Sequence, residues 1–194
     1  MKTVLLDIDS QLDFLYPAGA LYVPNAERIL PAIAHLNCFA AAHGIPVVST
    51  IDAHTENDPE FSVWPPHCVA GTWGQHKAEA TLVGGRITIP NRACDIALEG
   101  APQIVVEKQT VDVFRAPNLA RVFERLDADR YVVYGVVTEI CVLYAVRGLL
   151  KTGKPVTVVT DAVEALTAEA SARALEGIRA GGGRLATVSE IGVT

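Results

Sequence analysis

The chain lacks the features that would place it in several large classes of protein. Its 16 lysine and arginine residues form no basic block, and the formal net charge is −6, so a nucleic-acid-binding surface is not expected. No apolar run is long enough to span a membrane, and the run after Met1 is broken by Asp7 and too short for a signal peptide. We therefore expect a cytoplasmic protein whose partners are small molecules, neither nucleic acid nor membrane.

The chain also has no paired cysteine motif. Its four cysteines are Cys38, Cys68, Cys94 and Cys141, at wide and irregular spacings. This pattern is typical of reduced thiols in a cytosolic protein, and it argues against a disulfide framework or a cysteine-based metal knuckle.

Hydrophobic residues make up 50% of the 194 residues, which is enough to bury one full core. Short β-rich apolar runs alternate with segments whose apolar residues recur every three or four positions. Strands are expected at 3–8, 45–50, 103–107, 130–137, 155–160 and 184–188, and helices at 25–42, 117–127, 138–152 and 167–180. The alternation predicts a single α/β domain over 1–194, doubly wound, with a mostly parallel six-stranded sheet and helices on both faces.

The stretch 52–102 does not follow this alternation. It is rich in proline, glycine, histidine and tryptophan, and its periodicity is too weak for a crossover helix. Long irregular segments in compact domains are usually functional. We expect this region to bind a metal and the substrate.

Candidate catalytic residues follow from the position of ligands in open parallel sheets, outside the carboxyl ends of the strands. Asp9 and Asp13 follow the first expected strand, Lys108 ends the third, and Cys141 lies in the first helical turn after the fourth. Thr138 is the expected N-cap of that helix, so free backbone N–H groups and the helix dipole would favour a Cys141 thiolate. Taken alone, Cys141 is equally well interpreted as a buried core cysteine.

A thiol is mostly protonated at neutral pH, so it needs a base or a positive neighbour to act as a nucleophile. Asp13 and Lys108 can supply both, although a turn cap and a solvated strand end are the alternative interpretations of these two residues. No histidine follows the first, third or fourth strand, which disfavours a papain-like cysteine–histidine pair; His67, beside Cys68, is its one minor form. The expected catalytic set is Asp13, Lys108 and Cys141.

A second group of polar residues begins at the end of the second expected strand. Asp52 and His54 point the same way in an extended segment, so they can share a metal ion with His67 and Glu60 folding back from the loop. Nitrogen and oxygen ligands without thiolate suit zinc first, with iron or manganese as alternatives. The alternative is a set of loop residues that are solvated separately. We expect one divalent metal ion.

Several motifs resemble those of the isochorismatase-like cysteine hydrolases. They are Asp-x-Gln-x-Asp-Phe at 9–14, the strand-ending Lys108, and Gly-x-x-Thr-x-x-Cys-Val at 135–142. The additional Asp-x-His at 52–54 and Trp-Pro-x-His-Cys-Val-x-Gly-Thr at 64–72 are similar to the nicotinamidase/pyrazinamidase branch of that family. The resemblance spans nearly the whole chain, and the 64–72 segment is its most specific part.

The resemblance implies hydrolysis of a linear amide C–N bond, which would convert nicotinamide to nicotinate and ammonia in NAD salvage, with pyrazinamide as a second substrate. Cys141 would form a thioester, Asp13 would accept and return its proton, and Lys108 would favour the charged state. The backbone N–H groups of Val137 and Cys141 would form the oxyanion hole. A cis peptide bond is expected between Val136 and Val137.

The same resemblance assigns the binding of the substrate. The metal held by Asp52, His54, His67 and Glu60 would bind the pyridine nitrogen and position the ring. Phe14, Trp64 and Val136 would line the ring pocket, although the two aromatic residues could equally belong to the core. By analogy with the family we expect a homo-oligomer.

The sequence departs from the branch at several positions of the site. Ala53 stands where a tryptophan is frequent, Val137 where a smaller alanine is common, and Glu139 where an aspartate is frequent, and no glycine follows Lys108. Two alternatives therefore stay open. One is a metal-independent hydrolase of this family acting on another small amide or a vinyl ether, for which His54 would be dispensable. The other is a non-catalytic binding module of the same fold.

Overall fold

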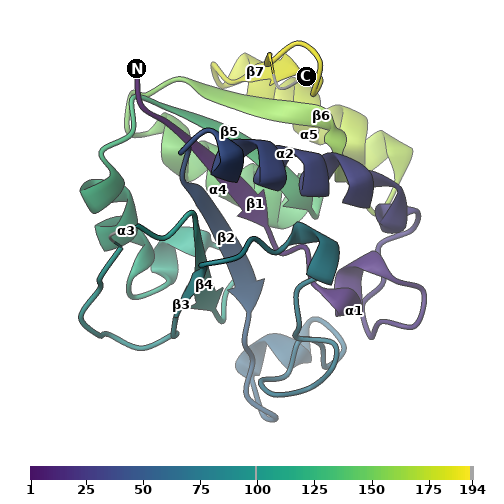
Figure 1. The fold of residues 1–194 in the computed structure, drawn as a ribbon. Helices are drawn as coiled ribbons and strands as arrows, with labels where there is room; N and C mark the ends of the chain where they lie inside the picture. Colours follow the sequence, from purple (N-terminus) through teal and green to yellow (C-terminus); the bar gives the residue numbers. More distant parts are fainter. Residues whose placement is uncertain (99, 193–194) are drawn as a thin grey trace.

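The computed structural model describes residues 1–98 and 100–192, so one residue of the expected loop region and the last two of the expected domain lie outside the described residues. Seven strands form a single sheet in the order β3-β4-β2-β1-β5-β6-β7 (Figure 1). Every pair of neighbouring strands is parallel. The strands are β1 (Thr3–Ile8), β2 (Val47–Asp52), β3 (Ile87–Ile89), β4 (Gln103–Lys108), β5 (Arg130–Val136), β6 (Val156–Glu164) and β7 (Arg184–Ala186).

The six predicted strands are all present, but the predicted count was too low by one. The additional strand, β3, is three residues long and lies at the edge of the sheet, where it pairs only with β4. It falls within the region expected to be a loop. Such a short strand carries too little periodicity to be detected in a segment rich in glycine and proline.

Helices cover both faces of the sheet, as the alternation predicted. They are α1 (Leu12–Leu15), α2 (Leu30–Ala42), α3 (Leu119–Leu126), α4 (Leu143–Leu150) and α5 (Ala168–Ala180). In the view of Figure 1, α2 crosses in front of the sheet and α4 lies behind it. Short turns of 3-10 helix occur at η1 (Ala26–Ile29), η2 (Pro59–Ser62), η3 (Glu79–Thr81) and η4 (Val113–Arg115). None of the helices in the described residues is long and apolar enough to cross a membrane.

The direction in which strands are added reverses beside β1. The chain places β2, β4 and β3 on one side of β1 and then crosses to β5, β6 and β7 on the other side. At the end of β5, Gly135 has φ +113°, and a Cβ atom there would lie 2.1 Å from the carbonyl oxygen of Ile8 in β1. Only glycine permits this close approach. It brings the residues that follow β1 and β5 together, at the position where open α/β sheets bind their ligands.

Candidate active site

Cys141 lies in the first turn after β5, as predicted. This turn, η5 (Thr138–Val142), is a single turn of π-helix that continues into α4. The N-cap is Val137 in an extended conformation, and not Thr138 as the sequence suggested, because the chain enters the helix one residue earlier. Such π-helical turns are frequent at functional sites. The expected cis peptide bond between Val136 and Val137 is confirmed.

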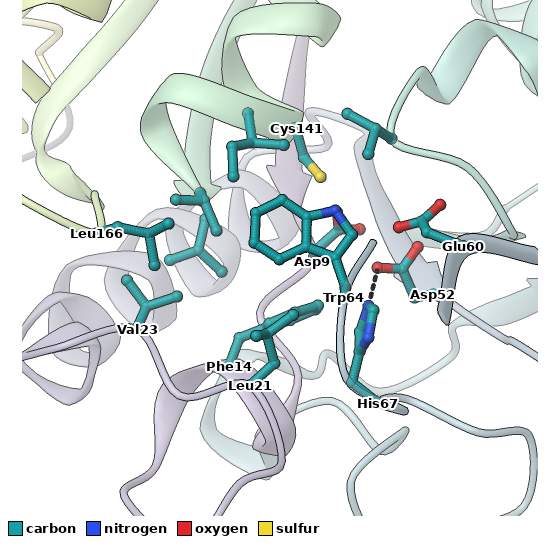
Figure 2. A pocket seen from close by; sticks show the side chains of 14 residues that line it. Asp9, Phe14, Leu21, Val23, Asp52, Glu60, Trp64, His67, Cys141 and Leu166 are labelled. Atoms are coloured by element: carbon teal, nitrogen blue, oxygen red, sulfur yellow. Dashed lines mark ion pairs between the residues drawn. The ribbon is translucent and has the colours of Figure 1, made fainter. Parts of the chain in front are cut away.

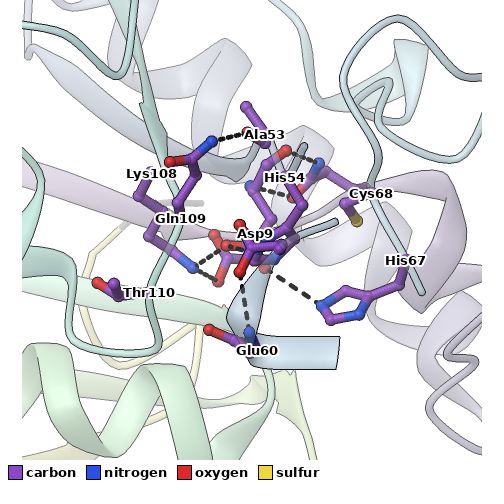
Figure 3. Close-up of polar contacts among 12 residues, drawn as sticks. Asp9, Ala53, His54, Glu60, His67, Cys68, Lys108, Gln109 and Thr110 are labelled. Atoms are coloured by element: carbon purple, nitrogen blue, oxygen red, sulfur yellow. Dashed lines mark hydrogen bonds and ion pairs between the residues drawn. The ribbon is translucent and has the colours of Figure 1, made fainter. Parts of the chain in front are cut away.

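Lys108 is buried at the end of β4 between two carboxylates (Figure 3). Its Nζ lies 2.9 Å from Asp9 Oδ2 and 2.5 Å from Asp52 Oδ1. Burial alone would lower the pKa of Lys108, but the two carboxylates outweigh it and raise that pKa well above its ordinary value. Lys108 is therefore a permanent positive charge at the carboxyl edge of the sheet.

Of the two aspartates that follow β1, Asp9 lies beside Lys108 and Asp13 does not. Asp9 follows β1 directly, has φ +48°, and accepts a hydrogen bond from Thr50 Oγ1 at 2.7 Å. A positive φ is uncommon for a residue other than glycine and often marks a functional position. Burial raises the pKa of Asp9, and the charge of Lys108 opposes this rise.

The structure places Asp13 elsewhere. Its carboxylate accepts hydrogen bonds from the backbone N–H groups of Ala20 at 2.8 Å and Cys68 at 2.7 Å. Asp13 lies in α1, one turn beyond the sheet edge, where Gly74 approaches so closely that a Cβ atom there would lie 2.1 Å from the carboxyl group. Asp13 therefore ties the loop that contains His67 to α1, and the structure does not bring it to Lys108 and Cys141.

Three of the four predicted metal ligands come together. Ligand atoms of Asp52, His54 and His67 lie within 4.8 Å of one another, and all three residues are buried. The Nδ1 atom of His67 donates to the carbonyl oxygen of Pro65 at 2.8 Å, which leaves Nε2 free to face Asp52. His54 Nε2 lies 3.8 Å from Asp52 Oδ1 and has no hydrogen-bond partner among the described residues. Because a buried polar nitrogen without a partner is costly, this set fits a divalent metal ion such as zinc.

Glu60 stands outside this group. It lies in η2 and lines the pocket together with Asp52 and His67, but none of its oxygen atoms belongs to the 4.8 Å cluster. Burial raises the pKa of Glu60, and the negative charge of Asp52 adds to the effect.

Two supporting residues were not assigned a role from the sequence. The side-chain amide of Gln11 accepts from the backbone N–H of Asp52 at 2.7 Å and donates to its carbonyl oxygen at 2.8 Å. Asp58 Oδ2 lies 3.0 Å from His54 Nδ1. Gln11 stands within the 9–14 motif, which was a usable signal, whereas Asp58 depends on a loop turn that no periodicity reveals.

Several of the candidate site residues line one pocket, whose wall is mostly apolar. Its apolar lining residues are Phe14, Leu21, Val23, Trp64, Val111, Val136, Val137, Ile140 and Leu166. Its polar lining residues are Asp9, Asp52, Glu60, His67 and Cys141. Figure 2 shows the Trp64 indole across the middle of the pocket, with the Cys141 sulfur on one side of it and Phe14 on the other. All three residues expected to bind the substrate ring, Phe14, Trp64 and Val136, are in the wall.

Electrostatics set the resting state of the cysteine. Burial raises the pKa of Cys141 well above its ordinary value; the positive charge of Lys108 opposes this, and Asp9 raises it further by its charge and as a hydrogen-bond acceptor. The sulfur is therefore a thiol at neutral pH, and it lies next to a carboxylate that can accept its proton. Cys68, by contrast, lies outside the pocket, and burial raises the pKa of its thiol as well.

A parallel α/β fold with a pocket at its topological reversal, lined by a buried cysteine and carboxylates, is typical of a hydrolase that acts on small molecules. The chain belongs to the isochorismatase family, since the model of the isochorismatase domain matches residues 3–81 and 89–190.

Relatives within this family carry more specific names. The nicotinamidase/pyrazinamidase of Mycobacterium tuberculosis is 28% identical over 190 residues, covering 90% of this chain and 93% of the relative. The crystal structure of a pyrazinamidase/nicotinamidase from Streptococcus mutans has a TM-score of 0.81 at 26% identity, covering 95% of this chain and 100% of that one. The pyrazinamidase of Pyrococcus horikoshii in complex with zinc has a TM-score of 0.80 at 28% identity, covering 96% and 99% of the two chains.

Proposed function

We propose that this protein is a metal-containing amidohydrolase that converts nicotinamide, and also pyrazinamide, to the carboxylate and ammonia. The observation that carries the proposal is that Cys141, Asp9, Asp52 and His67 line one mostly apolar pocket. His54 lies beside Asp52 and His67 in the same cluster of ligand atoms. The names of the relatives support the substrate class. The proposed setting is NAD salvage in the cytoplasm, by a homo-oligomer.

We assign the role of base to Asp9, in place of the Asp13 suggested by the sequence. Asp9 accepts the proton of the Cys141 thiol, whose raised pKa otherwise keeps it protonated. The raised pKa of Asp9 makes this carboxylate a stronger base than an exposed one. Lys108 stabilises the negative charge that the transfer leaves on sulfur.

The Cys141 thiolate attacks the carbonyl carbon of the amide, and the carbonyl oxygen becomes an oxyanion. Backbone N–H groups of Val137 and Cys141 are the proposed donors to this oxyanion. One such donor lowers the activation barrier by roughly 3–4 kcal/mol. The tetrahedral intermediate collapses to a thioester as Asp9 returns the proton to the departing ammonia. Asp9 then takes a proton from water, which attacks the thioester. The Cys141 thiolate leaves and takes this proton back from Asp9, and the carboxylic acid product ionises to the carboxylate.

A divalent metal at Asp52, His54 and His67, with zinc as the first candidate and iron or manganese as alternatives, would hold the pyridine nitrogen and so orient the ring. Glu60 is a further proposed ligand, reaching the ion from the rim of the pocket. Phe14, Trp64 and Val136 pack on the faces of the ring and keep bulk water away from the thioester. Gln11 keeps Asp52 in place through both of its backbone hydrogen-bonding groups.

The test is the release of ammonia from nicotinamide by purified, metal-loaded protein, with Cys141→Ala as the control for contaminating activity. Turnover that is absent from the variant supports the proposal. No turnover by metal-loaded wild type would contradict the nicotinamidase assignment and point to another small amide.

A metal-independent hydrolase of this family is the alternative. It predicts that His54→Ala and removal of metal by a chelator leave turnover of the true substrate unchanged, whereas the proposal predicts that both reduce turnover of nicotinamide. Inertness toward every amide tested, with a Cys141 thiol no more reactive than free cysteine, would favour a non-catalytic binding module.

A further inference from the structure

A buried carboxylate, that of Asp58, contacts one of the proposed metal ligands without lining the pocket itself. Asp58 is 8% exposed, and a turn in which its backbone N–H donates to Thr55 O at 3.2 Å folds it back onto His54. Its Oδ2 atom lies 3.0 Å from His54 Nδ1. It therefore meets the ring nitrogen that does not face Asp52.

We propose that Asp58 is a positioning residue that keeps the proton of His54 on Nδ1, so that Nε2 presents its lone pair toward Asp52 and His67. This inference rests on the metal-binding part of the proposed function. A carboxylate beside one imidazole nitrogen fixes the tautomer and the orientation of the ring, and it makes the other nitrogen a better ligand. Nε2, at 3.8 Å from Asp52 Oδ1, is the nitrogen that points into the cluster.

The backbone of His54 is fixed without help from Asp58. The N–H of His54 donates to Cys68 O at 3.1 Å, and its carbonyl oxygen accepts from Ala70 N–H at 2.8 Å. These bonds set where the residue lies, but they do not set the rotation of the ring or the site of its proton. Neither ring nitrogen has a well-aligned hydrogen bond within the described residues, so the contact with Asp58 is what distinguishes one nitrogen from the other.

The second oxygen of Asp58 extends the same control to the neighbouring turn. Oδ1 accepts from Glu60 N–H at 2.9 Å and so caps η2. Within η2, Phe61 packs against both imidazoles, with ring centroids 5.3 Å from His54 and 5.7 Å from His67. The Asp58 carboxylate thus fixes the site of the proton on the His54 ring. It also holds η2, the turn whose Phe61 packs on the rings of His54 and His67.

Two substitutions separate these roles. Asp58→Asn keeps the size of the side chain and an oxygen for Glu60, but its amide N–H₂ then faces the Nδ1–H of His54 and favours the opposite tautomer. Asp58→Ser also keeps an N-cap for η2 and removes the contact with His54. Asp112→Asn is the matched control, because Asp112 caps η4 in the same way, accepting from Phe114 N–H at 3.1 Å, and no histidine contact of its side chain occurs in the described chain.

The experiment measures zinc affinity by competition with a chromophoric chelator, and the tautomer of His54 in metal-free protein by long-range ¹H–¹⁵N NMR. We expect Nδ1 protonation in the wild type, and zinc binding weaker by about 10- to 100-fold in both Asp58 variants but unchanged in Asp112→Asn. Thermal unfolding confirms that the compared proteins are folded.

A wild-type ring protonated at Nε2, or a folded Asp58→Ser that binds zinc as tightly as the wild type, would overturn the inference. The NMR measurement does not depend on metal. If the wild type binds no zinc while Asp58→Asn changes the tautomer, the metal-binding part of the proposed function fails and the role of Asp58 in fixing the ring stands.

Discussion

Two buried lysine–aspartate clusters lie along β1 and differ in how their polar atoms are satisfied. In the first, Lys77 Nζ lies 2.7 Å from Asp7 Oδ2, which also accepts from Asn37 Nδ2 at 2.9 Å. In the second, Lys108 lies between Asp9 and Asp52. Every buried side-chain nitrogen and oxygen of Asp7, Asn37 and Lys77 has a partner. Beside the second cluster, by contrast, His54 Nε2 faces Asp52 Oδ1 at 3.8 Å and has no hydrogen-bond partner among the described residues.

This difference separates a structural network from a functional one. A fully satisfied buried network makes one conformation rigid and leaves nothing for a ligand to bind. Polar atoms without partners are costly, and they persist where a substrate or a metal can satisfy them. The same pair of residue types, within β1 and directly after it, thus serves the fold at Asp7 and the site at Asp9.

The largest expected effect contrasts two buried cysteines. Cys141→Ala removes the proposed nucleophile and should lower kcat/KM by about 10⁴-fold or more, with little loss of stability. Cys68→Ala should leave the turnover per folded molecule similar, because Cys68 lies outside the pocket and its thiol donates to the backbone carbonyl oxygen of Gly74, at 3.8 Å. Ammonia release and urea unfolding of both variants check this pair. Equal losses of turnover would argue against Cys141 as the nucleophile.

The next effect separates Asp9 from Asp13. Asp9→Asn removes the proposed base, and such groups contribute typically about 10²- to 10⁴-fold to the rate. Asp13→Asn leaves one of two backbone N–H groups, of Ala20 or Cys68, without an acceptor; for the buried Cys68 N–H this costs about 1–3 kcal/mol of stability. Kinetics and denaturant unfolding of both variants test the assignment. If Asp13→Asn were the more damaging to kcat in folded protein, the original assignment of the base to Asp13 would be restored.

The sequence predicted the fold and the neighbourhood of the site, because both depend on local signals. The apolar runs identified six strands, and the rule for strand ends brought Lys108 and Cys141 to one edge of the sheet. Local sequence signals could not show which of Asp9 and Asp13 lies beside Lys108. That depends on where α1 begins and on the approach of Gly74, distant in sequence, to Asp13. The contact of Asp58 with His54 likewise requires the fold of the 54–58 turn.

A third prediction concerns the loss of the structural network around Asp7, Asn37 and Lys77. Lys77→Met leaves the Asp7 carboxylate buried without its charge partner, and breaking such a pair costs about 3–5 kcal/mol of unfolding free energy. Turnover per folded molecule should change little, because Lys77 does not line the pocket of Cys141. The matched control is Lys2→Met, since Lys2 forms an exposed pair with Asp127 at 3.5 Å that should contribute little. Urea unfolding of the two variants makes the comparison, and equal stabilities would refute a structural role for the Asp7 cluster.

The smallest expected effect is a pH dependence of the turnover, which follows from the cluster of Lys108, Asp9 and Asp52. Burial raises the pKa of Asp9 above its ordinary value of 3.8, and only the ionised carboxylate can accept the thiol proton. Activity is therefore complete above that raised pKa, and kcat/KM falls as the pH drops through it, by about tenfold per unit below the midpoint. Cys141 adds no second limb at neutral pH, because burial raises its own pKa and it stays a thiol. In Asp9→Asn the residual rate should lose this acid limb. If the limb persists unchanged in Asp9→Asn, another group is the base, and the contrast between the two clusters would no longer explain the chemistry.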